Sequence, residues 1–180
     1  FMVDGVAAGF DSWEDSLAEM PAEKISDESI GVQMLYSSGT TGRPKGVFKP
    51  LPEGEYGVDE GPNLFEMLYG ASVNSIYLSP APLYHAAPLT FTMGMLSMGV
   101  TCIVMQHFEA EASLAAIEKY KVTHSQWVPT MFIRMLKLDD YVRLKHDVSS
   151  LQCAIHAAAP CPVPVKEQMI EWWGPVIHEY

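Results

Sequence analysis

Residues 36–47 carry the side chains and the spacing best suited to chemistry on a polyphosphate. The segment reads Tyr-Ser-Ser-Gly-Thr-Thr-Gly-Arg-Pro-Lys-Gly-Val, which places three glycines, four small hydroxyl residues and two cations in twelve positions. Glycines let the backbone approach a ligand closely, and successive N–H groups can form a concavity for an anion. Hydroxyl donors, an arginine fork and a lysine charge add to this. The segment therefore predicts a phosphate-binding loop, against the alternative of an ordinary Gly-rich hairpin or solvated turn.

The charge of the chain makes this loop an isolated cationic site. Lys and Arg together number 11 and Asp and Glu number 22, so the formal net charge is −11. Arg43, Lys45 and Lys49 form the only cationic cluster in the first 118 residues of the sequence. A broad basic surface of the kind that binds nucleic acid is absent from the sequence. The pattern favours a small, concentrated anion as the ligand.

Two common phosphate-binding patterns do not fit the loop. A Walker-type loop needs four residues between its first Gly and a Gly-Lys-Ser/Thr sequence. Here Gly39 is followed by Gly42, and Lys45 is followed by Gly46, so no magnesium-binding hydroxyl stands directly after the lysine. The G-x-G-x-x-G pattern of dinucleotide-binding proteins is also missing.

The elements that must position this loop follow from the hydrophobic pattern. The apolar run Ile30–Tyr36 leads directly into the loop and is expected to be a strand. Ser12 is expected to cap a first helix. Further strands are expected at 76–78, 100–105, 122–128, 151–155 and 176–177, and helices at 89–98 (buried), 109–120, 129–138 and 164–173. This alternation predicts an α/β fold, a layered and mostly parallel sheet flanked by helices, with ligands at loops beyond the carboxyl ends of strands.

The loop motif resembles the phosphate-binding signature of the adenylate-forming (AMP-binding) superfamily. That family comprises acyl- and aryl-CoA synthetases, the adenylation domains of peptide synthetases, and beetle luciferases. The matching positions are Ser38, Gly39, Thr40, Thr41, Gly42, Pro44, Lys45 and Gly46. Pro82–His85 resembles the segment that opens the family's acyl pocket. Ala157–Pro160 resembles the stretch beside adenine and acyl group, and His178–Tyr180 the approach to the Tyr-Gly-x-Thr-Glu motif.

The resemblance assigns roles to residues of this chain. It implies nucleotide binding by Ser37, Ser38, Gly39, Thr40, Thr41, Gly42, Arg43, Lys45, Ala158, Ala159 and Pro160. Within that set it implies catalytic roles for Thr40, Thr41 and Lys45. It implies an acyl pocket lined by Tyr84, His85, Trp127, Met131 and Ala157. The structural alternatives are core packing for the large apolar side chains, a buried histidine at position 85, and a tight turn at 157–160.

By this resemblance the expected parent activity is that of an ATP-dependent acid–thiol ligase. It would activate a carboxylic acid as an acyl-adenylate, with Mg²⁺ on the phosphates, and then form a thioester with CoA as co-substrate. A fatty or other hydrophobic acid is favoured over an amino acid, because residues 86–105 are largely apolar and 81–105 contain no Asp. The alternatives are delivery to a carrier protein, luciferase-like oxygenation, and a non-catalytic nucleotide-binding remnant.

The resemblance also indicates which part of a family member this chain corresponds to. Its 180 residues resemble an internal part of the family's large N-terminal domain, with a mobile surface insertion at 50–62. The family's C-terminal domain and its catalytic lysine are missing, so the chain alone is expected to be inactive. The oligomeric state stays open, a homodimer included.

The amino-acid composition allows predictions about the cellular compartment and about metal binding. A hydrophobic content of 48% supports a substantial core. Cys102, Cys153 and Cys161 are odd in number and not closely paired, which is typical of a reducing compartment. With neither a visible signal peptide nor an 18-residue apolar stretch, a cytoplasmic location and no transmembrane segment are expected. Cys153, His156 and Cys161 lack a fourth ligand for tetrahedral zinc, so no metal site is predicted beyond magnesium held through ATP phosphates.

Overall fold

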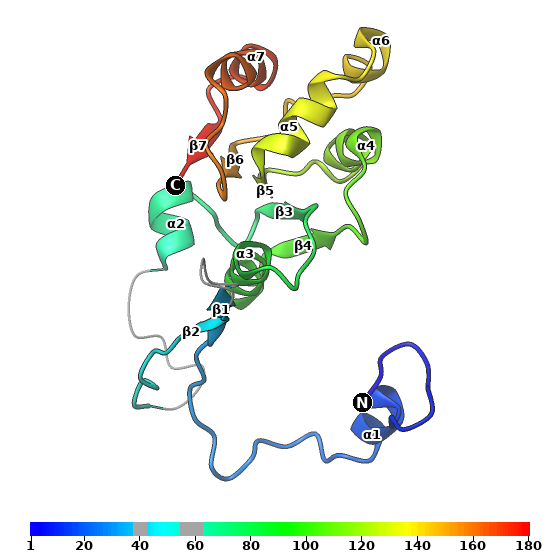
Figure 1. Ribbon diagram of the computed structural model, residues 1–180, viewed down its shortest axis with the longest axis vertical. Helices are drawn as coiled ribbons and strands as arrows, with labels where there is room; N and C mark the ends of the chain where they lie inside the picture. Colours follow the sequence, from blue (N-terminus) through cyan, green and yellow to red (C-terminus); the bar gives the residue numbers. More distant parts are fainter. Residues whose placement is uncertain (38–42, 55–62) are drawn as a thin grey trace. The chain divides into compact units, whose positions relative to one another are not determined.

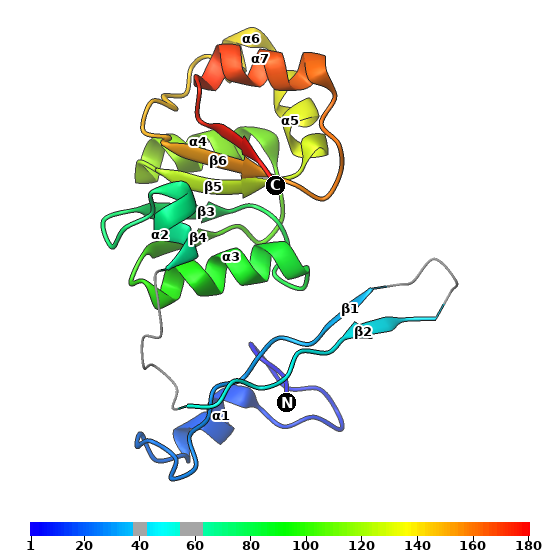
Figure 2. The ribbon, with the colours of Figure 1, turned by 90° about the vertical axis from the view of Figure 1, so that its left-hand side faces the viewer.

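The computed structural model describes residues 1–37, 43–54 and 63–180, and these form two compact units, Phe1–Glu60 and Gly61–Tyr180. Figures 1 and 2 show the elements of each unit. Among the described residues the first unit contains a two-stranded sheet and the second a five-stranded sheet. The first unit begins with α1 (Trp13–Ala18), which Ser12 caps as predicted by accepting a hydrogen bond from the Asp15 N–H at 3.1 Å.

The Gly-rich segment of the first unit is flanked by a hairpin. β1 (Leu35–Ser37) and β2 (Lys45–Val47) pair in antiparallel register, with Tyr36 opposite Gly46. The strand expected over Ile30–Tyr36 is therefore wrong in extent, since residues 30–34 are irregular. The segment after the loop folds back on the segment before it, so the loop joins antiparallel strands instead of following a parallel one.

The second unit is built on a parallel sheet. Its strands follow the order β4-β3-β5-β6-β7, and every neighbouring pair is parallel. The bounds are β3 (Ile76–Ser79), β4 (Thr101–Val104), β5 (His124–Trp127), β6 (Cys153–His156) and β7 (Ile177–Glu179). The predicted α/β class with a mostly parallel sheet is confirmed, and each of these strands lies within two residues of its expected range.

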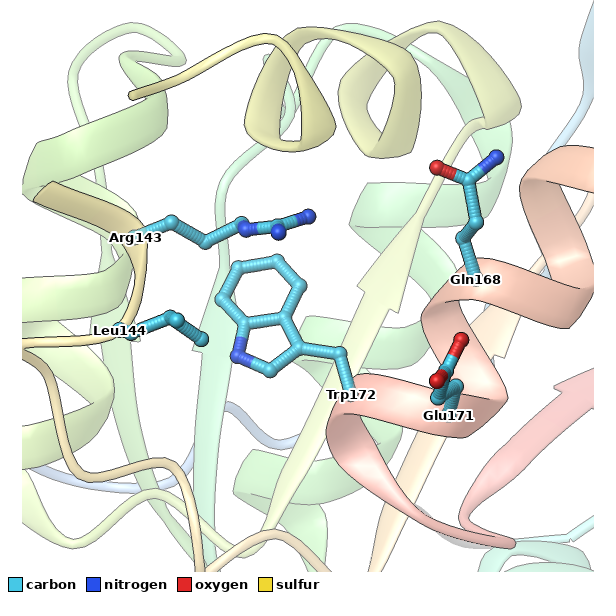
Figure 3. Close-up of a pocket in the computed structure, with 5 residues that line it drawn as sticks. All are labelled: Arg143, Leu144, Gln168, Glu171 and Trp172. Atoms are coloured by element: carbon cyan, nitrogen blue, oxygen red, sulfur yellow. The ribbon is translucent and has the colours of Figure 1, made fainter. Parts of the chain in front are cut away.

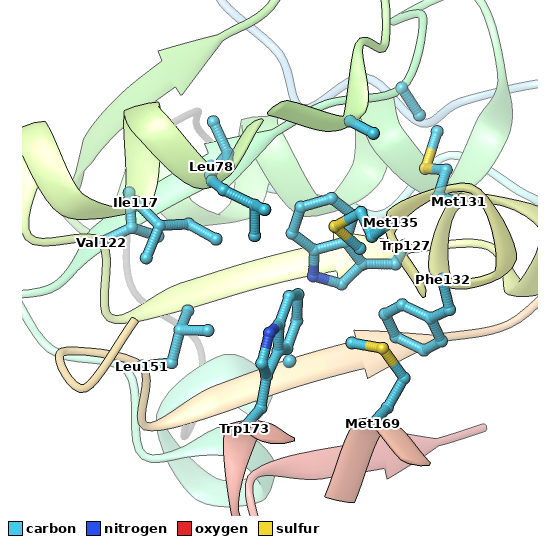
Figure 4. Packing of buried hydrophobic residues seen from close by; sticks show 14 residues of the cluster. Leu78, Ile117, Val122, Trp127, Met131, Phe132, Met135, Leu151, Met169 and Trp173 are labelled. Carbon is cyan, nitrogen blue, oxygen red and sulfur yellow. The ribbon is translucent and has the colours of Figure 1, made fainter. Parts of the chain in front are cut away.

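Helices cover both faces of this sheet (Figure 2). One face packs against α4 (Ala110–Tyr120), α5 (Pro129–Leu136) and α7 (Val163–Trp173), and the short α6 (Asp140–Arg143) follows α5. Their shared core is drawn in Figure 4 and includes Leu78, Ile117, Val122, Trp127, Met131, Phe132, Met135, Leu151, Met169 and Trp173. Burial of so many large side chains supplies the main driving force for this layer.

The opposite face packs against α2 (Leu64–Tyr69) and α3 (Ala86–Ser97). The buried residues of this second core are Ala71, Tyr77, Phe91, Met95, Val100, Cys153 and Ile155. The helix expected at 89–98 is present. The expectation that it is buried on all sides is wrong, because Met93 and Leu96 are each 51% exposed. Only the side of α3 that faces the sheet is covered by the described residues.

Local signals explain where several helices start. Pro129 occupies the first turn of α5, where its missing N–H costs nothing. Glu109 caps α4 by accepting from the backbone N–H groups of Glu111 and Ala112. Asn63 caps α2, which then ends at Gly70 with a left-handed φ of 68°. The sequence analysis missed α2 and α6, which are only one to two turns long.

Candidate active site

The described ends of the phosphate-loop segment present exposed cations. Ser37 pairs with Lys45 in the hairpin register, so Lys45 stands at the start of β2, next to the loop. Arg43, Lys45 and Lys49 are exposed, and none of them belongs to an ion pair among the described residues. No acidic side chain in the described part of the chain neutralises these charges.

The centre of the loop is not part of the described structure. The predicted site residues that lie outside the described residues are Ser38, Gly39, Thr40, Thr41 and Gly42. Only the backbone of Ser37 is described. The phosphate contacts assigned to residues 37–42, and the catalytic roles assigned to Thr40 and Thr41, stay predictions. Residues 55–62 of the expected mobile insertion also lie outside the described residues.

Gly46 leaves room for two side chains of the paired segment of the hairpin. A Cβ at this position would lie 2.8 Å from Met34 Cε and 3.1 Å from Tyr36 Cε1. The Tyr36 side chain therefore reaches over the cross-strand glycine, and its hydroxyl lies 3.7 Å from Met34 Sδ. This close approach gives the glycine of the motif a structural reason that is independent of any ligand.

Ala157–Pro160 follows directly after β6, at the carboxyl edge of the parallel sheet. The Ala157 N–H donates to the Trp127 carbonyl at 3.3 Å, which fixes the start of the segment to β5. Ala157 is buried, whereas Ala158, Ala159 and Pro160 are exposed. Ala158 has a φ of 74°, a left-handed conformation that is strained for a residue with a Cβ. Such strain is often found at ligand-contacting segments, and here it turns three small residues toward solvent.

Tyr84 and His85 lie beyond the carboxyl end of β3, where α3 begins. Their rings are 4.5 Å apart between centroids and inclined at 47°. Tyr84 is 83% exposed, and His85 is the N-cap residue of α3 without a side-chain capping bond. Both side chains are therefore free of the core, and the alternative of a buried histidine does not apply to His85.

Trp127 and Met131 lie in the core between the sheet and α5. Trp127 is fully buried, and its Nε1–H donates to Ser125 Oγ at 2.6 Å. Its ring packs edge-on against Trp173 at 5.5 Å, and Met131 is 7% exposed in the same cluster (Figure 4). This packing gives both residues a structural role, and their contact with an acyl group stays a prediction.

A charged group that was not predicted from the sequence lies beside Ala157–Pro160. His156 and Glu179 are register partners at the ends of β6 and β7, and His156 Nδ1 lies 4.0 Å from Glu179 Oε1. Glu179 also binds Lys166 of α7, and that bond lowers the pKa of the Glu179 carboxyl. Burial lowers the pKa of His156, which is fully inaccessible. Two polar residues ending consecutive strands were the signal available in the sequence.

Two of the residues considered for zinc, Cys153 and His156, lie on opposite faces of the parallel sheet. Cys153 packs in the core under α3, whereas His156 contacts Phe132 on the opposite face, with ring centroids 5.6 Å apart. Alternation along β6 thus separates two of the three residues considered for zinc. No group of three or more His, Cys, Asp or Glu residues with metal-binding geometry occurs among the described residues.

A surface hollow of about 420 Å³ lies between α6 and α7, apart from all of these residues (Figure 3). It is lined by Arg143, Leu144, Gln168, Glu171 and Trp172. The Arg143 guanidinium lies 5.2 Å from the centre of the Trp172 ring and bonds Asp140 at 2.7 Å. Its charge is thus already engaged, and no predicted site residue lines the hollow.

Comparison with known proteins identifies the family. The family described as AMP-binding enzyme matches residues 4–180, a range that spans both units. This chain belongs to the AMP-binding enzyme family. Probable CoA ligase CCL5 from Humulus lupulus is 32% identical over 174 residues, which are 87% of this chain and 29% of that protein.

Solved structures of this family share the fold. The N-terminal domain of FACL13 from Mycobacterium tuberculosis superposes with a TM-score of 0.70 at 24% identity, covering 92% of this chain and 40% of that one. O-succinylbenzoate coenzyme A synthetase (MenE) from Bacillus subtilis, solved with ATP and magnesium, has a TM-score of 0.63 at 26% identity. That match covers 87% of this chain and 32% of MenE.

The chain spans about three tenths of the length of the curated relatives it matches, 29% and 31% for two of them. In the described part of the chain, no helix has the length and apolar content needed to cross a membrane.

Proposed function

We propose that the protein containing this chain is an ATP-dependent acid–thiol ligase that forms an acyl-adenylate and then a CoA thioester. The observation that carries the proposal is the loop segment 36–47, whose described ends hold exposed cations that form no ion pair with another described residue, in a chain of net charge −11. The family membership of residues 4–180 and the CoA ligase names of the relatives support it.

In the first step, a carboxylate oxygen of the acid attacks the α-phosphorus of ATP. The new O–P bond replaces the bond to the bridging oxygen, and pyrophosphate leaves with the negative charge. Lys45 is proposed to stabilise that developing charge, with Arg43 and the donors of residues 37–42 holding the phosphates. Magnesium, bound through phosphate oxygens, would neutralise part of the same charge.

In the second step, a CoA thiolate attacks the acyl carbon and AMP leaves, after loss of the thiol proton. We assign Ala157–Pro160 to the adenylate, because three exposed small residues leave room for a flat base against the backbone. We assign Tyr84 and His85 to the entrance of the acyl pocket, because both side chains are exposed where α3 begins. A hydrophobic acid such as a fatty acid is the proposed substrate class, and the three free cysteines fit a reducing, cytoplasmic setting.

Pyrophosphate release by the full-length protein tests the proposal. It is measured with ATP, Mg²⁺ and a panel of fatty, aromatic and steroid-like acids, with and without CoA. Lys45→Ala should slow adenylation by about 10²- to 10³-fold, the usual effect of losing one transition-state donor. Lys49→Ala removes a neighbouring exposed cation outside the motif and should leave near-normal activity.

The outcomes separate the candidate activities. Pyrophosphate release without thioester formation from CoA would favour transfer to a carrier protein or to oxygen. Unchanged ATP–pyrophosphate exchange in Lys45→Ala would contradict the assignment of the loop. ATP binding without any acid-dependent pyrophosphate release would indicate a non-catalytic nucleotide-binding protein.

A further inference from the structure

Three buried hydroxyl groups between β3 and α3 have no partner with full hydrogen-bond geometry among the described residues. They belong to Tyr77, Ser79 and Thr92, whose side chains are 0%, 1% and 3% exposed. Tyr77 and Ser79 are two positions apart on β3 and so point to the same face of the sheet. Thr92 lies on the buried side of α3, which covers that face. Strand and helix therefore bring hydroxyls from two elements into one layer.

These three hydroxyls lie near one another, and their mutual contacts fall short of full hydrogen-bond geometry. Burial raises the pKa of Tyr77 far above its ordinary range, and the Ser79 and Thr92 hydroxyls act in the opposite direction. That lowering comes from hydrogen-bond interaction of the Ser79 and Thr92 hydroxyls with Tyr77, so the three groups lie close together. Among the described residues, none of the three oxygens has a partner with full hydrogen-bond geometry. Buried hydroxyls are normally paired, because an unpaired one loses its hydration without compensation. We therefore expect the hydroxyls of Tyr77, Ser79 and Thr92 to bind a further polar group that all three can contact.

The cluster lies in the same layer as the proposed acyl-binding segments. α3 starts directly after its N-cap residue His85 and reaches Thr92 in about two turns. On the same face, Ile155 of β6 precedes Ala157 by two residues and belongs to the same core as Tyr77. The Tyr180 ring is 5.7 Å from that of Phe91, the neighbour of Thr92. The cluster and the proposed entrance at Tyr84 and His85 therefore belong to the same layer of the second unit.

We propose that Tyr77, Ser79 and Thr92 form a specificity site that binds a neutral hydrogen-bonding group, a hydroxyl or carbonyl, on the acyl part of the acid substrate. This inference rests on the proposed ligase function and refines its substrate class. Three hydroxyls can both donate to such a group and accept from it. The same face of the sheet also buries His124 and Gln126 of β5, and burial lowers the pKa of His124. The remaining buried residues of this core are apolar, so the layer suits a neutral polar group better than a charged one.

Matched pairs of acids test the site in the full-length protein. The pairs are octanoic and 8-hydroxyoctanoic acid, and 3-phenylpropanoic and 3-(4-hydroxyphenyl)propanoic acid. The kcat/KM for pyrophosphate release gives a hydroxy-to-deoxy ratio for each pair. In at least one pair the ratio should exceed about 10, since a site built to bind a hydroxyl rejects the analogue that lacks it.

Thr92→Val and Tyr77→Phe remove one hydroxyl each with little change of shape. Each should lower the hydroxy-to-deoxy ratio by about fivefold or more and change the thermal midpoint little, because these hydroxyls make no contact of full hydrogen-bond geometry with the described residues. Ser113→Ala is the matched control. Ser113 is also fully buried, but its hydroxyl donates to the Glu109 carbonyl at 2.6 Å on the opposite side of the sheet. Its removal should leave the ratio unchanged.

The outcomes distinguish this inference from the proposed function. Ratios near 1 in every pair, with pyrophosphate released from both members, would overturn the specificity site alone. A high ratio that Thr92→Val and Tyr77→Phe leave intact would also overturn it, because another site would then read the hydroxyl. Absence of acid-dependent pyrophosphate release with any acid would overturn the ligase function and this inference with it.

Discussion

Two buried histidines provide a direct test of how hydrogen bonding governs stability in the second unit. His124 on β5 and His156 on β6 are both fully inaccessible. His124 Nε2 lies 3.0 Å from the Tyr69 carbonyl oxygen, and Nδ1 lies 2.8 Å from Thr123 Oγ1. Neither ring nitrogen of His156 has a hydrogen-bond partner. Replacing each histidine by leucine should therefore have opposite consequences near neutral pH.

The expected magnitudes follow from what each ring contacts. His124→Leu leaves the Tyr69 carbonyl without this donor at the end of α2 and should cost about 1–3 kcal/mol at pH 7.5. His156→Leu exchanges two buried nitrogens that make no hydrogen bond with the described residues, one of them 4.0 Å from Glu179 Oε1, for an apolar group of similar size beside Phe132. That change should be neutral or stabilising, because no hydrogen bond is removed.

The dependence on pH gives a second, independent signature. Burial lowers the pKa of both histidines, so below the ordinary value of about 6.5 the unfolded chain binds more protons than the folded one. Stability is then fully present above that value and is lost as pH falls toward the lowered, folded-state pKa values. Each histidine contributes a slope of at most about 1.4 kcal/mol per pH unit. Either leucine variant should remove one such contribution.

Urea unfolding at pH 7.5, 6.5 and 5.5, followed by the fluorescence of the four tryptophans, measures both effects. Trp127 and Trp173 lie in the core of this unit and report its unfolding. If His156→Leu destabilised the protein as much as His124→Leu at pH 7.5, His156 would have partners and the reasoning would be refuted. An unchanged pH slope in both variants would refute the proton-linkage part.

Three further substitutions test local packing and capping by differential scanning fluorimetry. Gly94→Ala on α3 should lower the thermal midpoint, because its Cβ would lie 2.0 Å from Phe65 Cε2, a clash that outweighs the helix-propensity gain of about 1 kcal/mol; an unchanged midpoint would contradict the α2–α3 packing. Ala158→Gly relieves the left-handed strain at this position but adds conformational entropy to the unfolded chain, so the net gain in stability should be at most about 1 kcal/mol. A marked loss of stability would contradict the presence of strain at Ala158. Glu109→Ala should cost about 1 kcal/mol through loss of the α4 cap, whereas Glu109→Asp should retain most of it.

Much of the second unit could be predicted from local patterns. Pro129 marks the start of α5, and Leu114 and Ile117 at helical spacing mark the buried side of α4. β2 was missed because Lys45–Val47 is short, exposed and part of a motif that suggested only a loop. α2 was missed because its six residues follow a Gly- and Pro-rich stretch, although Asn63 and Gly70 carried suitable capping signals.

The candidate site was predictable only where it consists of contiguous residues. The motif segments at 84–85 and 157–160 were found in the sequence, and the structure places both beyond the carboxyl ends of parallel strands. The His156–Glu179 pair depends on the register of β6 with β7, and the hydroxyls of Tyr77 and Thr92 meet only when α3 lies on β3. Sheet order and register are tertiary properties that spacing along the chain does not encode.

α3 shows most clearly why packing alone does not account for this part of the molecule. A helix that folds only to cover a sheet buries its apolar residues and exposes its polar ones. α3 instead buries Thr92 toward Tyr77 and Ser79, while Met93 and Leu96 remain about half exposed. Exchanging unpaired buried hydroxyls for apolar groups would stabilise the layer, so their presence works against folding. Departures of this kind are expected where residues serve binding at a cost in stability, which is the role proposed for the hydroxyl cluster.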